Sequence, residues 1–342
     1  MFSHLKITPK FWPFTSNICI HIEEQNVMLI GSVCMSHSPL LDGVRAPVEA
    51  EKGFRQALSR VHEKIAKLKP DLIVMMYPDH VNGFFYRLLP SFCVGIEGVS
   101  VGDFGSAPGA LSLPVPAAEE LAEFIVQEGV DTAISYKMAL DHGAIQPLEL
   151  LSENHEMPPF IPVFVNTAFA PRPTFARVRA LGRAVGKCAE AHPERILIIG
   201  SGGLSHDPPI PALAGADPQV RAQLINGNDL TFQQRFARTS LVMQEGEKMM
   251  KGESKLRPLN PAWDQAMLDA FTTSKLDILD DIPDDELTRT AGRGGHEIRT
   301  WFATLAAFDV VGGYEASVEF YEPIEAWLTG MGILTAIPKP AA

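Results

Sequence analysis

The chain has 342 residues with 46% hydrophobic content, four scattered cysteines and a formal net charge of −12. This length and hydrophobicity allow one large domain, whereas the acidic balance, without a basic cluster, argues against a nucleic-acid partner. Because the cysteines form neither a CxxC pair nor a dense framework, we expect a reduced, cytoplasmic protein without disulfides or a thiolate metal site.

The first 27 residues differ from the rest of the chain. Two prolines interrupt their only apolar patch and two glutamates follow it, so the segment does not resemble a signal peptide. We expect residues 1–27 to be a loose extension and residues 28–335 to form a single domain. No apolar run reaches the roughly 18 residues that cross a bilayer, and we expect no membrane association.

Strands and helices alternate through the first 200 residues. Short apolar runs predict strands that begin at Met28 or span 71–77, 131–138, 160–166 and 195–200. Apolar residues three and four positions apart predict helices over 54–68, 116–127 and 174–190. The stretch between the strand at 71–77 and about residue 114 is rich in predicted loops. This order predicts an α/β fold, in which a largely parallel central sheet carries helices on both faces in three layers, α/β/α.

Beyond residue 206 the pattern changes to helices. They are predicted at 229–250, at 283–291, at 296–308, and after Asn260, which would act as N-cap with Pro261 in the first helical position. We therefore expect a C-terminal helical elaboration of the same domain, which covers the sheet or forms a lid.

Four of the predicted strands are followed within a few residues by a histidine. These are His37, His80, His142 and His206, each in a turn rich in Gly, Pro, Asp or Ser. Ligands of open α/β sheets bind beyond the carboxyl ends of the strands, so the four imidazoles are expected to converge. Converging imidazoles indicate a metal ion and proton transfer.

A carboxylate near the C-terminus can complete such a site. Glu297 follows His296 in the first turn of an apolar predicted helix, where negative charge is favourable whatever its function. Two histidines and one carboxylate leave three neighbouring positions open on a metal, as in non-haem Fe(II) oxygenases. Zinc accepts the same ligands but does not transfer electrons, so these residues alone do not choose the metal. A second histidine in HExxH spacing is missing, which argues against that class of zinc protease.

Five motifs in one order resemble the type III extradiol catechol dioxygenases. They are SHSP at 36–39, YPDHVNGFFY at 77–86, DHG at 141–143, GSGGLSH at 200–206 and HEI at 296–298. The resemblance covers roughly residues 28–335. It implies a homo-oligomeric enzyme of aromatic-compound catabolism that uses Fe(II) and O₂ to open a catechol ring beside the diol. Within this family, the motifs most resemble those of members that act on catechols with a propionate or acrylate side chain.

The resemblance also implies roles for single residues. His37, His80 and Glu297 would hold the iron, with His142 as proton donor and His206 as proton acceptor. This division is chemically sensible, because a metal-bound imidazole has lost the lone pair that a base needs. A free histidine, with a pKa near 6.5, can both accept and give a proton at neutral pH.

Substrate-binding residues are less evident. Phe84, Phe85 and Tyr86 would offer an aromatic wall to the catechol ring, although ordinary core packing explains them equally well. Arg293, in the turn before Glu297, is a candidate partner for the substrate carboxylate.

Two other functions remain open at this point. A zinc hydrolase or lyase could use the same histidines and glutamate, with His206 as base, and a non-catalytic binding module could share the scaffold. The Asp103-Phe104-Gly105 sequence imitates a kinase motif without the companion motifs of that family, so we interpret it as a turn.

Overall fold

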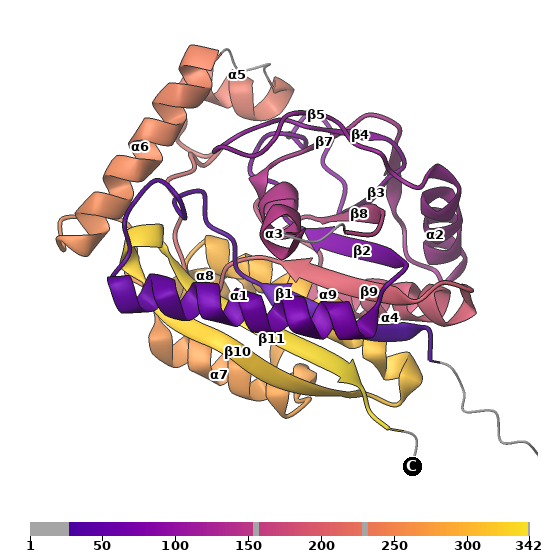
Figure 1. Ribbon diagram of the computed structural model, residues 1–342. Helices are drawn as coiled ribbons and strands as arrows, with labels where there is room; N and C mark the ends of the chain where they lie inside the picture. The colour runs from indigo at the N-terminus through magenta and orange to yellow at the C-terminus, as the bar shows by residue number, and fades with distance from the viewer. Residues whose placement is uncertain (1–26, 153–156, 228–231, 341–342) are drawn as a thin grey trace, which may run out of the picture.

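The computed structural model describes residues 27–152, 157–227 and 232–340 (Figure 1). The predicted extension lies, apart from Val27, outside the described residues, as do residues 229–231 of the helix predicted at 229–250. No helix in the described ranges is long and apolar enough to cross a membrane.

Eight strands form one sheet in the order β10-β11-β1-β9-β2-β8-β3-β6. Their bounds are β1 (Leu29–Met35), β2 (Leu72–Tyr77), β3 (Phe92–Gly95), β6 (Ala133–Ser135), β8 (Phe160–Val165), β9 (Ile196–Ser201), β10 (Tyr314–Ile324) and β11 (Thr329–Pro338). The central strands β1, β9, β2 and β8 are parallel to one another. Antiparallel pairs join β11 to β1, β10 to β11 and β3 to β8. The predicted parallel sheet is thus confirmed for the centre of a mixed sheet.

Helices cover both faces of this sheet, which confirms the three-layer prediction (Figure 1). Alternate residues of β2 show the division, because Ile73 and Met75 belong to one hydrophobic core and Val74 and Met76 to the other. The first core includes α1 (Val48–Leu68) and α3 (His142–Ser152), whereas α2 (Val115–Gln127), α4 (Phe175–Ala191), α7 (Pro261–Thr272) and α9 (Ile298–Ala306) pack in the second. Central strands buried on both sides are continuous apolar runs for this reason.

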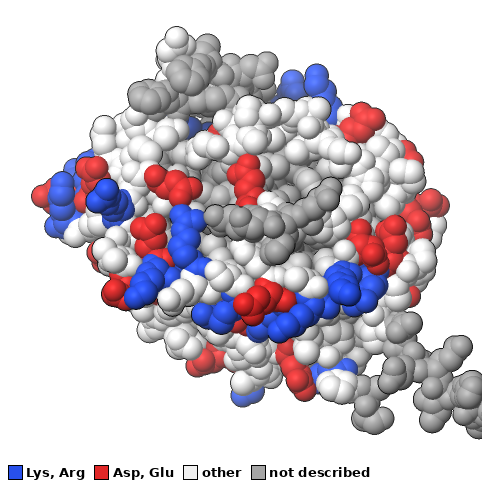
Figure 2. Space-filling view, viewed as in Figure 1, with Lys and Arg blue, Asp and Glu red and all other residues white. Residues whose placement is uncertain are grey.

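The amphipathic pattern of α1 explains its position. Phe54, Leu58, Val61 and Ile65 are buried against the sheet, and each such side chain contributes roughly 1.5–3 kcal/mol of burial free energy. Figure 2 shows charged side chains of both signs over the outer face of this helix. The helix ends at Leu68, and Lys69 adopts a left-handed conformation before Pro70.

The run at 131–138 is not one strand, contrary to our prediction. It divides into β6 at the edge of the large sheet and β7 (Met138–Leu140), which belongs to a three-stranded sheet with β4 (Gly98–Ser100) and β5 (Gly109–Ala110). A bend at residues 136–137 separates the two strands, and there the backbone N–H of Lys137 donates to the Ser135 hydroxyl. His142 therefore follows a strand of the small sheet and begins α3.

The helices predicted beyond residue 206 are present, but the strands that follow them were not predicted. The described helices in this part are α5 (Pro218–Asn226), α6 (Phe232–Met250), α7, α8 (Asp284–Ala291) and α9, with short 3-10 helices such as η2 (Gly294–Glu297) between them. Asn260 caps α7 as predicted, since its side chain accepts from the N–H of Trp263. The chain then returns as the hairpin β10–β11, in which β11 pairs with β1 and is buried along most of its length.

Candidate metal centre

Three neighbouring parallel strands bring three of the predicted histidines to one edge of the sheet. His37 follows β1, His206 follows β9 and His80 follows β2, and these strands are adjacent in that order. Glu297 reaches the same edge from the end of η2, where its Oε2 accepts the backbone N–H of Gly203 at 2.7 Å. His142 arrives separately, as the first residue of α3.

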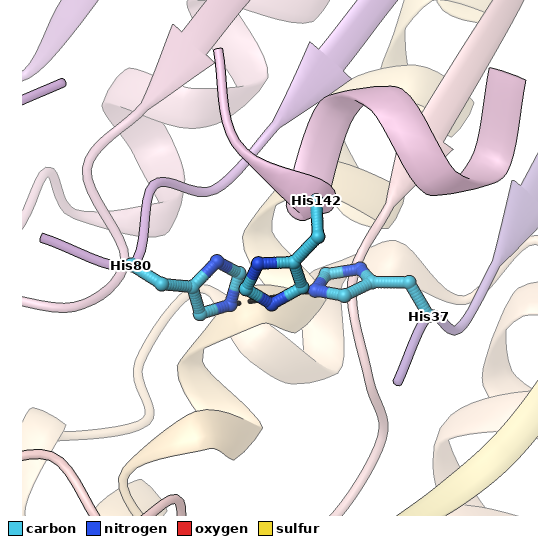
Figure 3. Close-up of side chains that lie close together, drawn as sticks. All are labelled: His37, His80 and His142. Atoms are coloured by element: carbon cyan, nitrogen blue, oxygen red, sulfur yellow. Dashed lines mark hydrogen bonds between the residues drawn. The ribbon is translucent and has the colours of Figure 1, made fainter. Parts of the chain in front are cut away.

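All five predicted residues lie together. The Nε2 atom of His80 is 3.4 Å from Nε2 of His37 and 3.2 Å from Oε1 of Glu297, and that oxygen is 3.3 Å from Nε2 of His206. The His142 ring stacks on the His80 ring with 4.4 Å between centroids. Figure 3 shows the imidazoles of His37, His80 and His142 pointing toward one another from three different segments. One ring nitrogen from each lies within 4.8 Å of the other two.

Hydrogen bonds behind the rings orient the nitrogen atoms. The Ser201 hydroxyl donates to the carbonyl of Gly143 at 2.5 Å, so it accepts at 2.9 Å from the Nδ1–H of His37. Nδ1 of His80 lies 3.2 Å from a carboxylate oxygen of Asp141. Both Nε2 atoms are thereby directed at the space between the rings, as such outer partners commonly do for metal-ligating histidines.

His142 has a carboxylate partner of its own, which sequence reasoning missed. Asp103 accepts the backbone N–H of His142 at Oδ1 and its Nδ1–H at Oδ2, at 2.8 and 2.6 Å. The sequence Asp103-Phe104-Gly105 is therefore more than a turn. The sequence feature that could have indicated this contact is a polar residue that follows a short strand. Because β4 and β7 are parallel neighbours, the residues that follow these two strands lie close together.

The loop at 78–86 is organised by its own polar side chains. Asp79 accepts the backbone N–H groups of Asn82, Gly83 and Phe84. Burial and the nearby Asp141 raise the pKa of Asp79 to about 7. The amide of Asn82 in turn donates to a carboxylate oxygen of Asp141 at 3.0 Å. This loop thus holds His80 and its outer partner in one unit.

The electrostatics of the cluster follow from burial and mutual contact. Burial lowers the pKa of His37 to about 3, which keeps this ring neutral. Burial alone would lower the pKa of His80, but Asp141 and Glu297 raise it well above its ordinary value. Burial alone would raise the pKa of Glu297, but His206 and His80 hold it well below the usual range. A neutral His37 and an ionised Glu297 are the forms that bind a metal.

The cluster opens into a cavity of about 630 Å³. His37, His80, His142 and His206 line it on one side, and the remainder is mainly apolar, with side chains from residues 208–211, α5 and α6. A mostly apolar cavity with a few converging polar groups is typical of a small-molecule site.

The predicted substrate-binding residues have different surroundings. Phe85 lines the cavity. Phe84 instead stacks on Phe164 with 3.7 Å between ring centroids, and Tyr86 packs on Phe169. Two of the three aromatic residues therefore contribute to packing.

Arg293 is engaged outside the cavity. Its guanidinium donates to the carboxylate of Asp207 and to the carbonyls of Pro208 and Ile210, at 2.6–2.8 Å. These contacts give Arg293 a bracing role behind the segment that lines the cavity, and its prediction as a substrate ligand receives no support from them.

Comparisons with known proteins extend this description. A family model described as the catalytic LigB subunit of aromatic ring-opening dioxygenase matches residues 31–332. Two relatives, from Escherichia coli K12 and E. coli O157:H7 (strain EC4115), are both named 2,3-dihydroxyphenylpropionate/2,3-dihydroxicinnamic acid 1,2-dioxygenase. Each is 40% identical over 304 residues, which cover 89% of this chain and 97% of the relative.

A solved structure is also similar, although weakly. It is that of the uncharacterized protein JW3007 from E. coli K12, with a TM-score of 0.48 and 11% identity, and it covers 90% of this chain and 99% of that one. A similarity of this size adds nothing about function.

Proposed function

The chain belongs to the LigB family of extradiol aromatic ring-opening dioxygenases, and within that family we propose that it cleaves 2,3-dihydroxyphenylpropionate and its cinnamate analogue. The names of the 40% identical relatives support this choice of substrate. The observation that carries the proposal is the convergence of His37, His80 and Glu297 beside a cavity large enough for a substituted catechol.

His37, His80 and Glu297 are the proposed ligands of Fe(II), the metal of this family. Ligand atoms that share one ion at about 2.1 Å, at angles of roughly 90–110°, lie about 3.0–3.4 Å apart. The two separations at His80 Nε2, 3.4 Å to His37 and 3.2 Å to Glu297, agree with this spacing. These two separations support a metal ion shared at His80, and His142 also has a ring nitrogen within 4.8 Å of those of His37 and His80. When bound, Fe(II) supplies positions for both catechol oxygens and for O₂, together with a route for electron transfer.

His206 is the proposed proton acceptor. Its Nδ1–H donates to the carbonyl of Leu204 at 2.9 Å, and its Nε2 lies 3.3 Å from Oε1 of Glu297. With Glu297 bound to a metal ion, that Nε2 would be available to take the proton of a catechol hydroxyl. Such a positioned base is typically worth about 10²–10⁴ in rate.

His142 is the proposed proton donor. The Asp103 carboxylate accepts the Nδ1–H of this ring at 2.6 Å, which orients the ring so that its Nε2 would donate a proton to the substrate during ring cleavage. Only 3% of His142 is exposed, which limits competing proton exchange with water. The ring of the substrate opens beside the diol.

The family assignment favours this reading over the two alternatives left open by the sequence. A zinc hydrolase would need no electron transfer, and a binding module would need neither His142 nor His206 at the site. Both histidines line the cavity in addition to the proposed ligands, which supports ring cleavage.

An anaerobic reconstitution tests the proposal. Metal-free protein is loaded with Fe(II) or Zn(II) and then exposed to O₂ with catechols that bear propionate, acrylate, methyl or hydrogen. We expect O₂ uptake and a yellow ring-opened product with Fe(II) alone, fastest with the propionate and acrylate compounds. Equal turnover with zinc, or none with iron, would contradict it. Light scattering on the same protein tests the expected homo-oligomer.

A further inference from the structure

The proposed substrates carry a side-chain carboxylate, which needs a partner when it enters an apolar cavity. Among the described residues that line the cavity, the charged side chains other than histidine are Arg238, Glu245 and Lys248. All three belong to α6, which lies beside α5 at one end of the molecule (Figure 1). The choice of a cation is therefore between Arg238 and Lys248.

The charge of Lys248 is already compensated. Its ammonium donates to Glu245 at 3.1 Å, and half of its side chain is exposed to solvent. A substrate carboxylate beside it would also meet the negative charge of Glu245. In addition, Lys248 lies ten positions beyond Arg238, which is about 15 Å along the helix axis at 1.5 Å per residue.

The charge of Arg238, in contrast, is not compensated by a described carboxylate. Its Nη2 donates to the backbone carbonyl of His80 at 2.7 Å and its Nη1 to the side-chain carbonyl of Asn82 at 3.3 Å. Both acceptors are neutral, and within the part of the chain that the structure describes no carboxylate forms an ion pair with this guanidinium. A guanidinium has five N–H groups, so donors remain for a ligand.

The position of Arg238 matches the needs of a substituted catechol. Its partner carbonyl belongs to His80, a proposed metal ligand, so the guanidinium lies next to the loop that holds the ring-binding end of the site. The spacing of Ala237, Arg238, Leu241 and Val242 presents one face of α6 to the cavity. On that face apolar side chains lie beside the cation, with Gln234 one turn before it, and a carboxylate is recognised strongly in such mainly apolar surroundings.

We propose that Arg238 binds the side-chain carboxylate of the substrate and selects catechols that carry one, an inference that rests on the proposed function. The planar fork of arginine suits two parallel bonds to a carboxylate. The bonds to His80 and Asn82 hold the fork in place before the substrate arrives, which reduces the ordering cost of binding.

Kinetics with two substrates test the inference. Wild type, Arg238→Gln, Arg238→Lys and Lys248→Gln are loaded with Fe(II) and compared on 2,3-dihydroxyphenylpropionate and 3-methylcatechol. We expect Arg238→Gln to raise KM for the carboxylated compound on the order of 10- to 100-fold, as for a lost charge-assisted bond, and to change KM for 3-methylcatechol less than about threefold. Arg238→Lys should recover part of the loss.

Three results would overturn the assignment. Equal losses on both catechols in Arg238→Gln would mean that the residue only holds the His80 loop, and iron content reports that role directly. Unchanged kinetics in Arg238→Gln, or loss of discrimination in Lys248→Gln instead, would contradict it as well. Anaerobic calorimetry with the same two catechols measures recognition without turnover. Selective binding without ring cleavage would therefore count against the proposed function and leave the role of Arg238 standing.

Discussion

Asp103 accepts two hydrogen bonds from His142, one from its backbone N–H at 2.8 Å and one from its ring Nδ1–H at 2.6 Å. A carboxylate in this position fixes both the rotation of the ring and the nitrogen that carries the proton.

Replacing Asp103 by Asn should therefore disable His142 without removing it. The amide can offer an N–H to Nδ1, which favours the wrong tautomer, and we expect kcat to fall by about 10²-fold or more. KM and iron content should be unchanged. The pH profile of kcat is the decisive measurement, because a merely structural role would not move it. Asp42→Asn, on an exposed side chain paired with Arg55, is the matched control, and a kcat within threefold of wild type for Asp103→Asn would argue against the dyad.

The metal ligands can be separated from the proton-transfer residues by metal analysis. Glu297→Gln preserves shape but removes the charge, and His37→Ala removes a ring, so both variants should lose most of their iron. Glu286→Gln, on the exposed face of α8, controls for the loss of one negative charge. Iron retained in full by Glu297→Gln would exclude this carboxylate as a ligand.

The variants His206→Gln and His142→Gln should behave in the opposite way. Neither residue is a proposed ligand, so iron should stay bound while ring cleavage falls by about 10²–10⁴. In anaerobic stopped-flow measurements, His142→Gln should still show the spectral change that accompanies catechol binding, because this residue is needed only after the substrate is bound. Full turnover by either variant with normal iron would contradict the assignment of that histidine.

Metal binding should release protons. Burial alone would lower the pKa of His80, but Asp141 and Glu297 raise it well above 6.5, so the metal-free protein keeps a proton on this ring to higher pH than a free imidazole does. That proton must leave before Nε2 can bind a metal, and metal affinity should therefore rise with pH. Calorimetry in buffers of different ionisation enthalpy measures the release, expected to be about one proton or more per ion. An affinity independent of pH would be inconsistent with a protonated His80.

Arg293→Gln should affect stability more than substrate recognition. Its guanidinium makes three hydrogen bonds to residues 207–210, and we expect a loss of about 1–2 kcal/mol in the free energy of unfolding at pH 7. Burial alone would raise the pKa of Asp207, but Arg293 lowers it. The stabilisation from the Arg293–Asp207 pair is fully present above the unfolded-state pKa of the Asp207 carboxyl, about 3.9. It is lost as the pH falls through the lower pKa that this carboxyl has in the folded state.

Denaturant titrations of wild type and Arg293→Gln at pH 7 and pH 3 test whether the stabilisation by Arg293 decreases as the pH falls. The difference in unfolding free energy between wild type and variant should shrink at the lower pH. A selective rise in KM for the propionate catechol in Arg293→Gln, with unchanged stability, would instead restore its prediction as a substrate ligand.

The sequence predicted the α/β sheet and the convergence of the histidines, but not every strand. Apolar runs mark β1, β2 and β9 clearly, and because these are parallel neighbours, the positions of His37, His80 and His206 after them were sufficient to bring the three together. His142 lies in the cluster as predicted, but it does not follow a strand of the large sheet. Its strand belongs to the small sheet, and no local pattern distinguishes Met138–Leu140 there from an edge strand of the large one.

Other features depend on contacts between distant segments. Asp103 reaches His142 across 39 positions, and Arg238 reaches the His80 carbonyl across 158, separations at which neither spacing nor periodicity gives information. The hairpin β10–β11 was missed for a related reason. Strand β11 is buried by β1 and by helices on both sides, so it lacks the alternation that identifies a half-exposed strand.

The hairpin also sets an order of events during biosynthesis. Strand β11 completes the sheet beside β1, and Trp327, Leu328 and Thr329, in the bend just before it, form part of the cavity wall. Because these residues follow the four cavity histidines and Glu297 in the sequence, a nascent chain that lacks them already contains every proposed metal ligand but not the whole cavity wall. The wall is thus completed only when β11 pairs with β1.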